Sequence, residues 1–132
     1  MTDWFEYAQP VRYFEIDGQG VVFNAWYLAY MDEAINAYLG HRGVDYATLV
    51  ASGYDLQLVH TELDWTTSLR YGDVGAVAVR TEALGTTSLT IGFEIRRGEG
   101  GPAVCTARSV YVCISVGGGK VPLPDLLRTN LS

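Results

Sequence analysis

One carboxylate stands on a glycine turn directly ahead of the longest helix that the sequence predicts. Asp17 precedes a Gly-Gln-Gly step, and apolar residues at helical spacing begin soon afterwards. An ionised carboxylate can attack a carbonyl carbon or take a proton from water, and N–H groups at a helix N-terminus can hold charge that develops on the carbonyl oxygen. This pairing indicates acyl transfer with Asp17 as the catalytic residue. The alternative is an Asp that only caps its turn, which is common beside Gly.

The helix that must position these N–H groups is predicted from Asn24 to Gly40, with Asn24 as its N-cap. Its apolar residues recur at helical spacing: Tyr27, Met31, Ala34, Ile35 and Tyr38. Because further aromatic residues widen this apolar surface, we expect burial on most sides of the helix. A second, short helix is predicted at residues 45–51.

Alternation with a period of two predicts strands at residues 4–13, 56–67, 74–84, 88–97 and 103–116. Pro10 marks the first of them as an edge strand or a bulged one. Pro122 and Pro124 mark a tail that we expect to cover a sheet edge. One central helix with long antiparallel strands predicts an α+β fold in which the sheet wraps around the helix, in a single domain spanning residues 1–132.

The composition excludes several classes of protein. Apolar residues make up 48% of the 132 residues and charged ones 18%, which argues against disorder, and a net charge of −6 argues against a nucleic-acid-binding surface. No apolar run reaches the length of a membrane span, and the first ten residues lack the pattern of a signal peptide. Cys105 and Cys113 lie eight residues apart on one predicted strand, too far for a disulfide, and are expected as buried thiols. These features predict a cytoplasmic protein.

From Val11 onward the chain resembles the hotdog-fold acyl-CoA thioesterases of the 4-hydroxybenzoyl-CoA thioesterase type. The residues that carry this resemblance are Arg12, Tyr13, Asp17, Gly20, Val22, Asn24, Tyr27, Tyr30, Glu33, Ala34, the run 70–73, Gly85, Ser88 and the run 121–124. The resemblance implies a five-stranded antiparallel sheet wrapped around the helix. It also implies a homodimer, often paired into a homotetramer, with active sites at subunit interfaces and no cofactor.

Carried over to this chain, the resemblance makes Asp17 the catalytic carboxylate and assigns polarisation of the thioester carbonyl to the backbone N–H at or near Asn24. The chain also departs from the family pattern. Many relatives have a His near position 21 or 24, where this chain has Val21 and Asn24. The loop before Ser88 is often basic in relatives but is Gly-Thr-Thr here, which leaves the contacts to the CoA phosphates open.

Further residues are candidates for substrate binding. The set comprises Gly20 of the turn, the aromatic residues Phe23, Trp26 and Tyr27 at the helix entry, His60, Arg70 and Ser88. Arg70, with Arg96 and Arg97, is the candidate for phosphate contacts. Each has a plain structural alternative: core aromatics, a hydrogen-bonded structural histidine, solvated surface arginines and an ordinary serine at a strand start. Asp32 and Glu33 on the helix are less favoured alternative carboxylates.

The sequence therefore predicts an acyl-CoA thioesterase that needs no metal. The aromatic helix entry favours an aromatic or a compact, short- to medium-chain acyl group, while the same rings could also wall a fatty-acyl tunnel. Within the chain there is no GxSxG, HExxH or CxxC motif, so a serine nucleophile and a zinc site are not expected. One alternative is a thioesterase acting on acyl carrier protein, because a carrier delivers pantetheine without the CoA nucleotide. Another is a non-catalytic module that binds acyl-CoA without consuming it.

Overall fold

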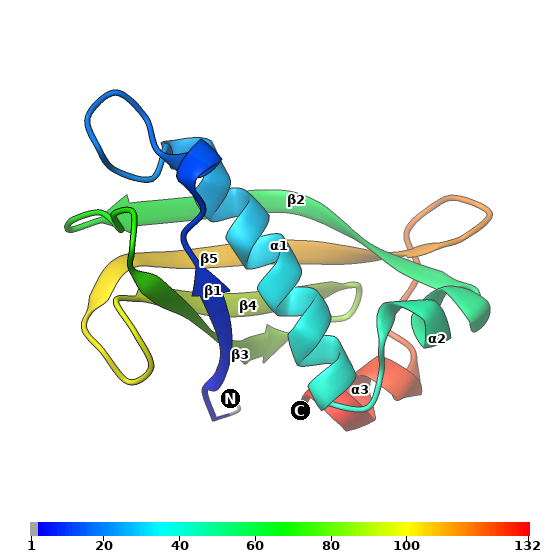
Figure 1. Cartoon of the computed structure of the whole chain (residues 1–132). Helices are drawn as coiled ribbons and strands as arrows, with labels where there is room; N and C mark the ends of the chain where they lie inside the picture. The colour runs from blue at the N-terminus through cyan, green and yellow to red at the C-terminus, as the bar shows by residue number, and fades with distance from the viewer. Residues whose placement is uncertain (1–2) are drawn as a thin grey trace.

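The computed structural model describes residues 3–132, and in this range five strands form one antiparallel sheet in the order β1-β3-β4-β5-β2. The strands are β1 (Phe5–Pro10), β2 (Tyr54–Trp65), β3 (Val74–Leu84), β4 (Ser88–Arg96) and β5 (Ala103–Ser115). The helices are α1 (Asn24–His41), α2 (Tyr46–Ala51) and α3 (Asp125–Leu131). The long helix α1 crosses one face of the curved sheet (Figure 1). The predicted hotdog architecture is confirmed.

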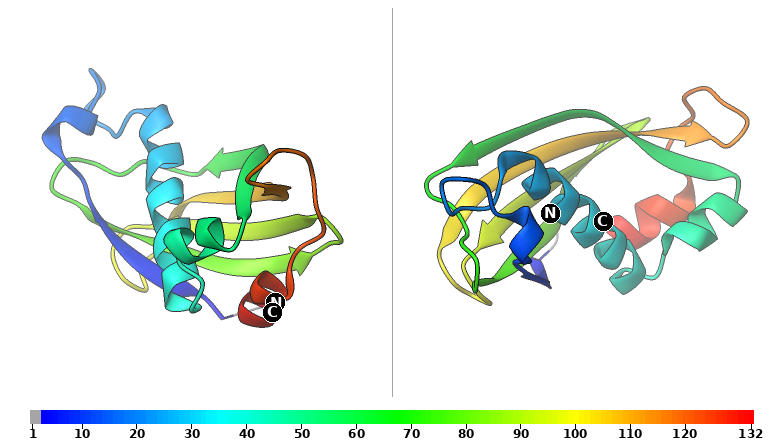
Figure 2. Two further views of the ribbon diagram at one scale, coloured as in Figure 1. Left: turned by 90° about the vertical axis from the view of Figure 1, so that its right-hand side faces the viewer. Right: turned by 45° about the horizontal axis from the view of Figure 1, so that its top comes forward.

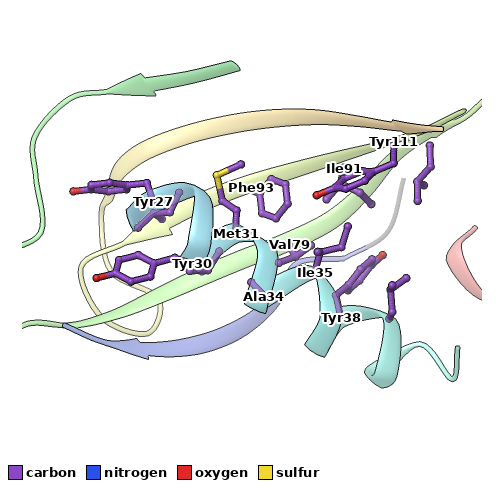
Figure 3. Packing of buried hydrophobic residues seen from close by; sticks show 14 of the residues in the cluster. Tyr27, Tyr30, Met31, Ala34, Ile35, Tyr38, Val79, Ile91, Phe93 and Tyr111 are labelled. Carbon is purple, nitrogen blue, oxygen red and sulfur yellow. The ribbon is translucent and has the colours of Figure 1, made fainter. Parts of the chain in front are cut away.

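Helix α1 packs on the sheet through one apolar stripe. Its buried residues are Tyr27, Tyr30, Met31, Ala34, Ile35, Tyr38 and Leu39. They face Val79, Ile91 and Phe93 of the sheet (Figure 3). Burial on most sides of the helix was a wrong expectation for the single chain, because the sheet curves around one side only and leaves Leu28 44% exposed.

Two element ends differ from the sequence prediction. β1 stops at Pro10, as an edge strand, and Tyr13–Glu15 form a 3₁₀ turn instead of continuing the strand. The Glu15 side chain accepts the N–H of Arg12 at 2.8 Å, which stabilises this turn. α1 runs past Gly40 to His41, and the chain then turns at Gly43, whose φ of +83° favours glycine.

The C-terminal tail first pairs with the end of β5, where the N–H of Val121 donates to the carbonyl of Cys113 at 3.1 Å, and then forms helix α3. It lies against the β3–β4 turn, where the N–H of Leu123 donates to the carbonyl of Thr86 at 2.9 Å. Leu127 and Leu131 of α3 are fully buried. The tail therefore closes the core near the C-terminal end of α1, and the views in Figure 2 show α3 beside that end.

The two cysteines are both buried and free, as predicted, and burial raises the pKa of the Cys105 thiol to about 11. A thiol with such a pKa stays protonated near neutral pH and is a poor nucleophile. None of the helices in residues 3–132 has the length and apolar content needed to cross a membrane.

Candidate active site

The Asp17 turn is a short, hydrogen-bonded hairpin. Its main chain pairs Asp17 N–H with the carbonyl of Val21 at 2.9 Å and Gly20 N–H with the carbonyl of Asp17 at 3.0 Å. Gly20 has a φ of +78°, which a residue with a side chain rarely adopts. Oδ1 of Asp17 accepts the N–H of Gln19 at 2.8 Å, and Oδ2 has no hydrogen-bond partner among residues 3–132. One carboxylate oxygen is therefore held while the other is open to a ligand.

The chain passes from this turn straight into the N-terminus of α1. Phe23, not Asn24 as predicted, is the N-cap, and no side chain caps the helix. The N–H of Phe23 donates to the carbonyl of Glu15 at 2.9 Å, and that of Trp26 to the carbonyl of Phe23 at 3.0 Å. Within the described chain no group accepts from the N–H of Asn24 or Ala25. Asn24 therefore sits in the first turn as a residue with a free N–H, the group that can hold an oxyanion.

A buried carboxylate lies beneath the Asp17 turn. Glu15 is fully buried and accepts hydrogen bonds from Tyr30 Oη at 2.6 Å and from the Arg12 guanidinium at 2.8 Å. Burial alone raises the pKa of Glu15, but the hydrogen bonds from Tyr30 and Arg12 outweigh it, so the net pKa lies below its usual value. Glu15 is thus an ionised acceptor, and its burial keeps it from touching a substrate.

Arg70 and two aromatic residues, three of the candidate substrate contacts, lie around the Asp17 turn. Val21 forms a β-bridge with Arg70, whose side chain is exposed. Phe23 is 50% exposed, and the half-buried ring of Trp26 meets the exposed Phe14 edge-on at 5.5 Å. Arg70, Phe23 and Trp26 therefore form an accessible rim beside Asp17.

Arg96 and Arg97 are already engaged. Arg96 forms ion pairs with Glu6 at 2.8 Å and with Glu94 at 2.9 Å. Arg97 donates to the carbonyl of Ser68 and lies 3.6 Å from Asp73. Of the three arginines, Arg70 is the one whose guanidinium forms no ion pair within residues 3–132.

Tyr27 lies in the core, where its side chain is not accessible to a substrate. It is fully buried, its ring meets Trp65 at 5.5 Å, and its Oη accepts the N–H of Leu69 at 3.0 Å. Its role is to hold the segment that pairs with the Asp17 turn, since the carbonyl of Leu69 accepts the N–H of Val22.

Two other predicted contacts lie away from Asp17 within the chain. A bulge between Leu58 and His60 shifts the register of β2, so His60 pairs with Val110 on the face turned away from α1. Ser88 starts β4 beside the turn that α3 covers, near the other end of α1 (Figure 1). Neither side chain meets Asp17 in one copy of the chain.

The sequence did not reveal a cavity between α1, α2, β2 and β5. It measures about 300 Å³ and is lined by Asp32, Ile35, Asn36, Leu39, Tyr46, Leu49, Asp55, Leu56 and Tyr111. Tyr46 Oη donates to Asp55 at 3.0 Å, and burial, with the nearby Asp32, raises the pKa of Tyr111 to about 12. Of the residues that line this cavity, the sequence analysis had named only Asp32 as a functional candidate, as an alternative carboxylate on the helix. The other lining residues come together through packing between segments that are distant in the sequence. Across residues 3–132, no three His, Cys, Asp or Glu side chains are grouped to hold a metal ion.

Comparisons with known proteins identify the family of this chain. The sequence profile of the thioesterase-like superfamily matches residues 11–131. A 1,4-dihydroxy-2-naphthoyl-CoA hydrolase of Synechococcus elongatus is 24% identical over 127 residues, which are 94% of this chain and 92% of the relative.

Solved structures share the whole fold. A protein of Aquifex aeolicus superposes with a TM-score of 0.90 at 25% identity, over 97% of this chain and 99% of that one. A 1,4-dihydroxy-2-naphthoyl-CoA thioesterase from Synechocystis does so with a TM-score of 0.86 at 25% identity, over 98% and 96%. The predicted class, a thioester hydrolase with the hotdog fold, is confirmed. The chain belongs to the thioesterase-like superfamily.

Proposed function

We propose that this acyl-CoA thioesterase uses Asp17 as its catalytic carboxylate and the N–H groups at the start of α1 to polarise the thioester carbonyl. The observation that carries the proposal is the juxtaposition of two open groups in one hydrogen-bonded unit. Asp17 Oδ2 and the N–H of Asn24 have no partner among residues 3–132, and main-chain hydrogen bonds from Asp17, Gly20 and Val22 close the turn between them. A ligand with an electrophilic carbonyl would fit between a free acceptor and a free donor.

Two routes agree with this arrangement. In the first, Asp17 takes a proton from water, hydroxide adds to the carbonyl carbon, and the oxyanion rests on the Asn24 N–H until the CoA thiolate leaves. In the second, Asp17 attacks the carbonyl itself, expels the thiolate and forms a mixed anhydride that water then hydrolyses. Both routes yield free acid and thiol and both require an ionised Asp17.

The acyl group is proposed to be aromatic. The rim beside Asp17 presents Phe23 and Trp26, and aromatic rings pack favourably edge to face or offset-stacked. The naphthoyl-CoA hydrolase relative and the naphthoyl-CoA thioesterase structure act on bicyclic aromatic acyl groups by their names. A fatty-acyl substrate is the competing outcome and would be shown by faster turnover of palmitoyl-CoA than of benzoyl-CoA.

We further propose that the active unit is a homodimer formed through β2, with a homotetramer as a larger assembly. β2 has a free edge in the chain and carries exposed apolar residues, Leu58 and Val59 among them. Such an edge is a ready template for pairing with a second copy. The Trp65 end of β2 lies beside the start of α1, and the Tyr54 end follows α2 and the cavity.

Antiparallel pairing of β2 with β2 of a second copy would therefore bring the cavity of one copy next to Asp17 of the other. In that arrangement the cavity is proposed to take the acyl group. Val59→Lys should weaken the pairing, and light scattering with activity assays should show dimer and turnover lost together. A monomeric variant with full activity would contradict this proposal.

Acyl carrier protein is the second candidate donor of the acyl group, and one contact favours it. The β3–β4 turn is often basic in the family. In this chain the cation beside the turn is Arg128 of α3, and its guanidinium donates to the carbonyls of Gly85 and Thr86. It is thus occupied and poorly placed to bind a nucleotide phosphate. Comparing the same acyl group on CoA, on pantetheine and on carrier protein separates the donors.

The test of the proposed function is thiol release from a panel of acetyl-, hexanoyl-, palmitoyl-, benzoyl- and 4-hydroxybenzoyl-CoA. Asp17→Asn should fold normally and lose most turnover, by about 10²-fold or more. Asp125→Asn, which changes an exposed carboxylate at the other end of the molecule, is the matched control and should keep wild-type rates. Full turnover by Asp17→Asn would exclude Asp17, and tight binding without turnover by the wild type would favour a binding module.

A further inference from the structure

A second acidic residue binds the Asp17 turn to the body of α1. The Glu15 carboxylate has no exposed surface and receives hydrogen bonds from Arg12 N–H at 2.8 Å, from Arg12 Nε at 3.1 Å and from the Arg12 terminal nitrogen at 2.8 Å. Tyr30 Oη donates to it at 2.6 Å. Charge-assisted hydrogen bonds of this kind are the strong ones in proteins. The carboxylate is therefore a fully bonded anchor.

The same residue holds the start of the helix through its main chain. Its carbonyl accepts the N–H of Phe23, the N-cap of α1, at 2.9 Å. Its side chain holds Tyr30, which lies six residues after Asn24 on the buried face of α1 (Figure 3). Asp17 follows Glu15 by two residues. Glu15 thus fixes the chain just before Asp17 to both the first turn of the helix and its interior.

We propose that Glu15 is a positioning residue for Asp17: it sets the placement of the Asp17 carboxylate relative to the N–H groups of α1. The inference rests on the proposed function, in which these two groups act on one thioester carbonyl. Small errors in such placement are costly, since a shift of about 1 Å can lower a rate about 10²-fold. Glu15 has no route to the substrate, so its effect must pass through the turn.

The chemistry of the anchor requires a carboxylate of this length. Every group that meets it, from Arg12 and Tyr30, is a donor, and an ionised carboxylate offers acceptors only. In Glu15→Gln the new NH₂ would point at the donors of Arg12. In Glu15→Asp the carboxylate would be one methylene shorter and could not reach Arg12 and Tyr30 together. Neither variant should restore the native placement.

The first measurement compares Glu15→Gln with a variant that also removes a hydrogen bond from the buried face of α1. Tyr38→Phe is the matched control, because Tyr38 is another fully buried tyrosine of α1 whose Oη lies 2.7 Å from Thr81 Oγ1, near the far end of the helix. Glu15→Gln should lower kcat about 10- to 100-fold with KM nearly unchanged. Tyr38→Phe should leave kcat and KM at wild-type values even where it lowers the melting temperature equally. Equal kcat in both variants would overturn the proposal.

The second measurement asks whether Glu15 acts through Asp17. In an Asp17→Asn background, Glu15→Gln should change the residual rate less than about two-fold, because the group being positioned is already disabled. The same 10- to 100-fold loss in both backgrounds would mean that the two residues act independently, and the positioning role would be wrong.

A third readout does not depend on turnover. The Phe23 amide is protected by the Glu15 carbonyl, so its hydrogen exchange should be faster in Glu15→Gln than in Tyr38→Phe. If the wild type hydrolyses no thioester, the proposed function is wrong. The exchange result would still show whether Glu15 holds the Asp17 turn against the start of α1. Unchanged exchange at Phe23 would overturn the positioning role whatever the activity.

Discussion

The two ends of α1 are built in opposite ways. At the N-terminal end the chain leaves groups open: the N–H of Asn24 and Ala25, one oxygen of Asp17, and the exposed rings of Tyr13 and Phe14. At the C-terminal end α3 covers the core. Arg42 Nε there donates to the carbonyl of Asn130 at 2.7 Å.

This difference separates stability from chemistry along one helix. Polar groups without partners cost free energy when they are enclosed, so a chain can leave them only where a ligand or water can reach. At the C-terminal end of α1, which we call the closed end, side chains donate to main-chain carbonyls; Arg128, for example, donates to the carbonyl of Gly85 at the β3–β4 turn. The N-terminal end of α1 with the Asp17 turn is the open end. We therefore expect loss of a buried side chain at the closed end to lower stability with little effect on the reaction, and loss of an unpartnered group at the open end to lower the rate with little effect on stability.

The largest expected effect is on stability at the closed end. Leu127 of α3 is fully buried, and Leu127→Ala should lower the free energy of unfolding by about 2–5 kcal/mol through lost burial and a residual cavity. Urea unfolding measures this loss. Turnover per folded molecule, assayed well below the melting transition, should stay at the wild-type value. A fall in kcat without a fall in stability would break the proposed separation of the two ends.

The next effect is on the reaction at the open end. Proline is tolerated in the first position of a helix and has no N–H, so Asn24→Pro removes one donor with little change in shape. Phe23 before it has φ −64° and ψ 141°, which suit a residue that precedes proline. We expect kcat to fall about 10²–10³-fold, the usual cost of one oxyanion donor.

Asp125→Pro is the matched control for this change. Asp125 is the first residue of α3, and Pro124 before it is also extended, with φ −70° and ψ 160°. The control should keep wild-type kcat, and Asn24→Ala should do so as well because it keeps the N–H. If Asn24→Ala loses as much activity as Asn24→Pro, the side chain and not the backbone N–H contributes to the reaction.

The sequence predicted elements that depend on local pattern and missed those that depend on distant partners. The predicted strand at residues 74–84 matches β3 because alternation and flanking turns are local signals. The position of His60 could not be predicted, because the bulge after Leu58 reverses the alternation of β2 and nothing in the local sequence marks that bulge. α3 was not predicted, because its leucines are buried only by packing against core residues that are distant in the sequence. The Asp17 turn was found because Gly20 and the helix start stand beside it in the sequence.

The smallest effect is the pH dependence of stability, and it belongs to the open end. Hydrogen bonds from Tyr30 and Arg12 overcome burial and lower the pKa of Glu15 in the folded chain. Its contribution to stability is therefore complete above the pKa of the unfolded chain and is lost as the pH falls through the folded-state pKa. Each unit of difference between these pKa values is worth about 1.4 kcal/mol.

Urea unfolding of the wild type and Glu15→Gln between pH 7 and pH 3 measures this contribution. The difference in unfolding free energy should be constant near neutral pH and should shrink in acid, because Gln cannot titrate. Tyr38→Phe at the closed end should differ from the wild type by the same amount at every pH in this range, since the substitution leaves every carboxylate of the chain in place. A Glu15→Gln difference that stayed constant down to pH 3 would mean that the carboxylate contributes through packing alone, and the two ends of α1 would then differ in exposure but not in electrostatics.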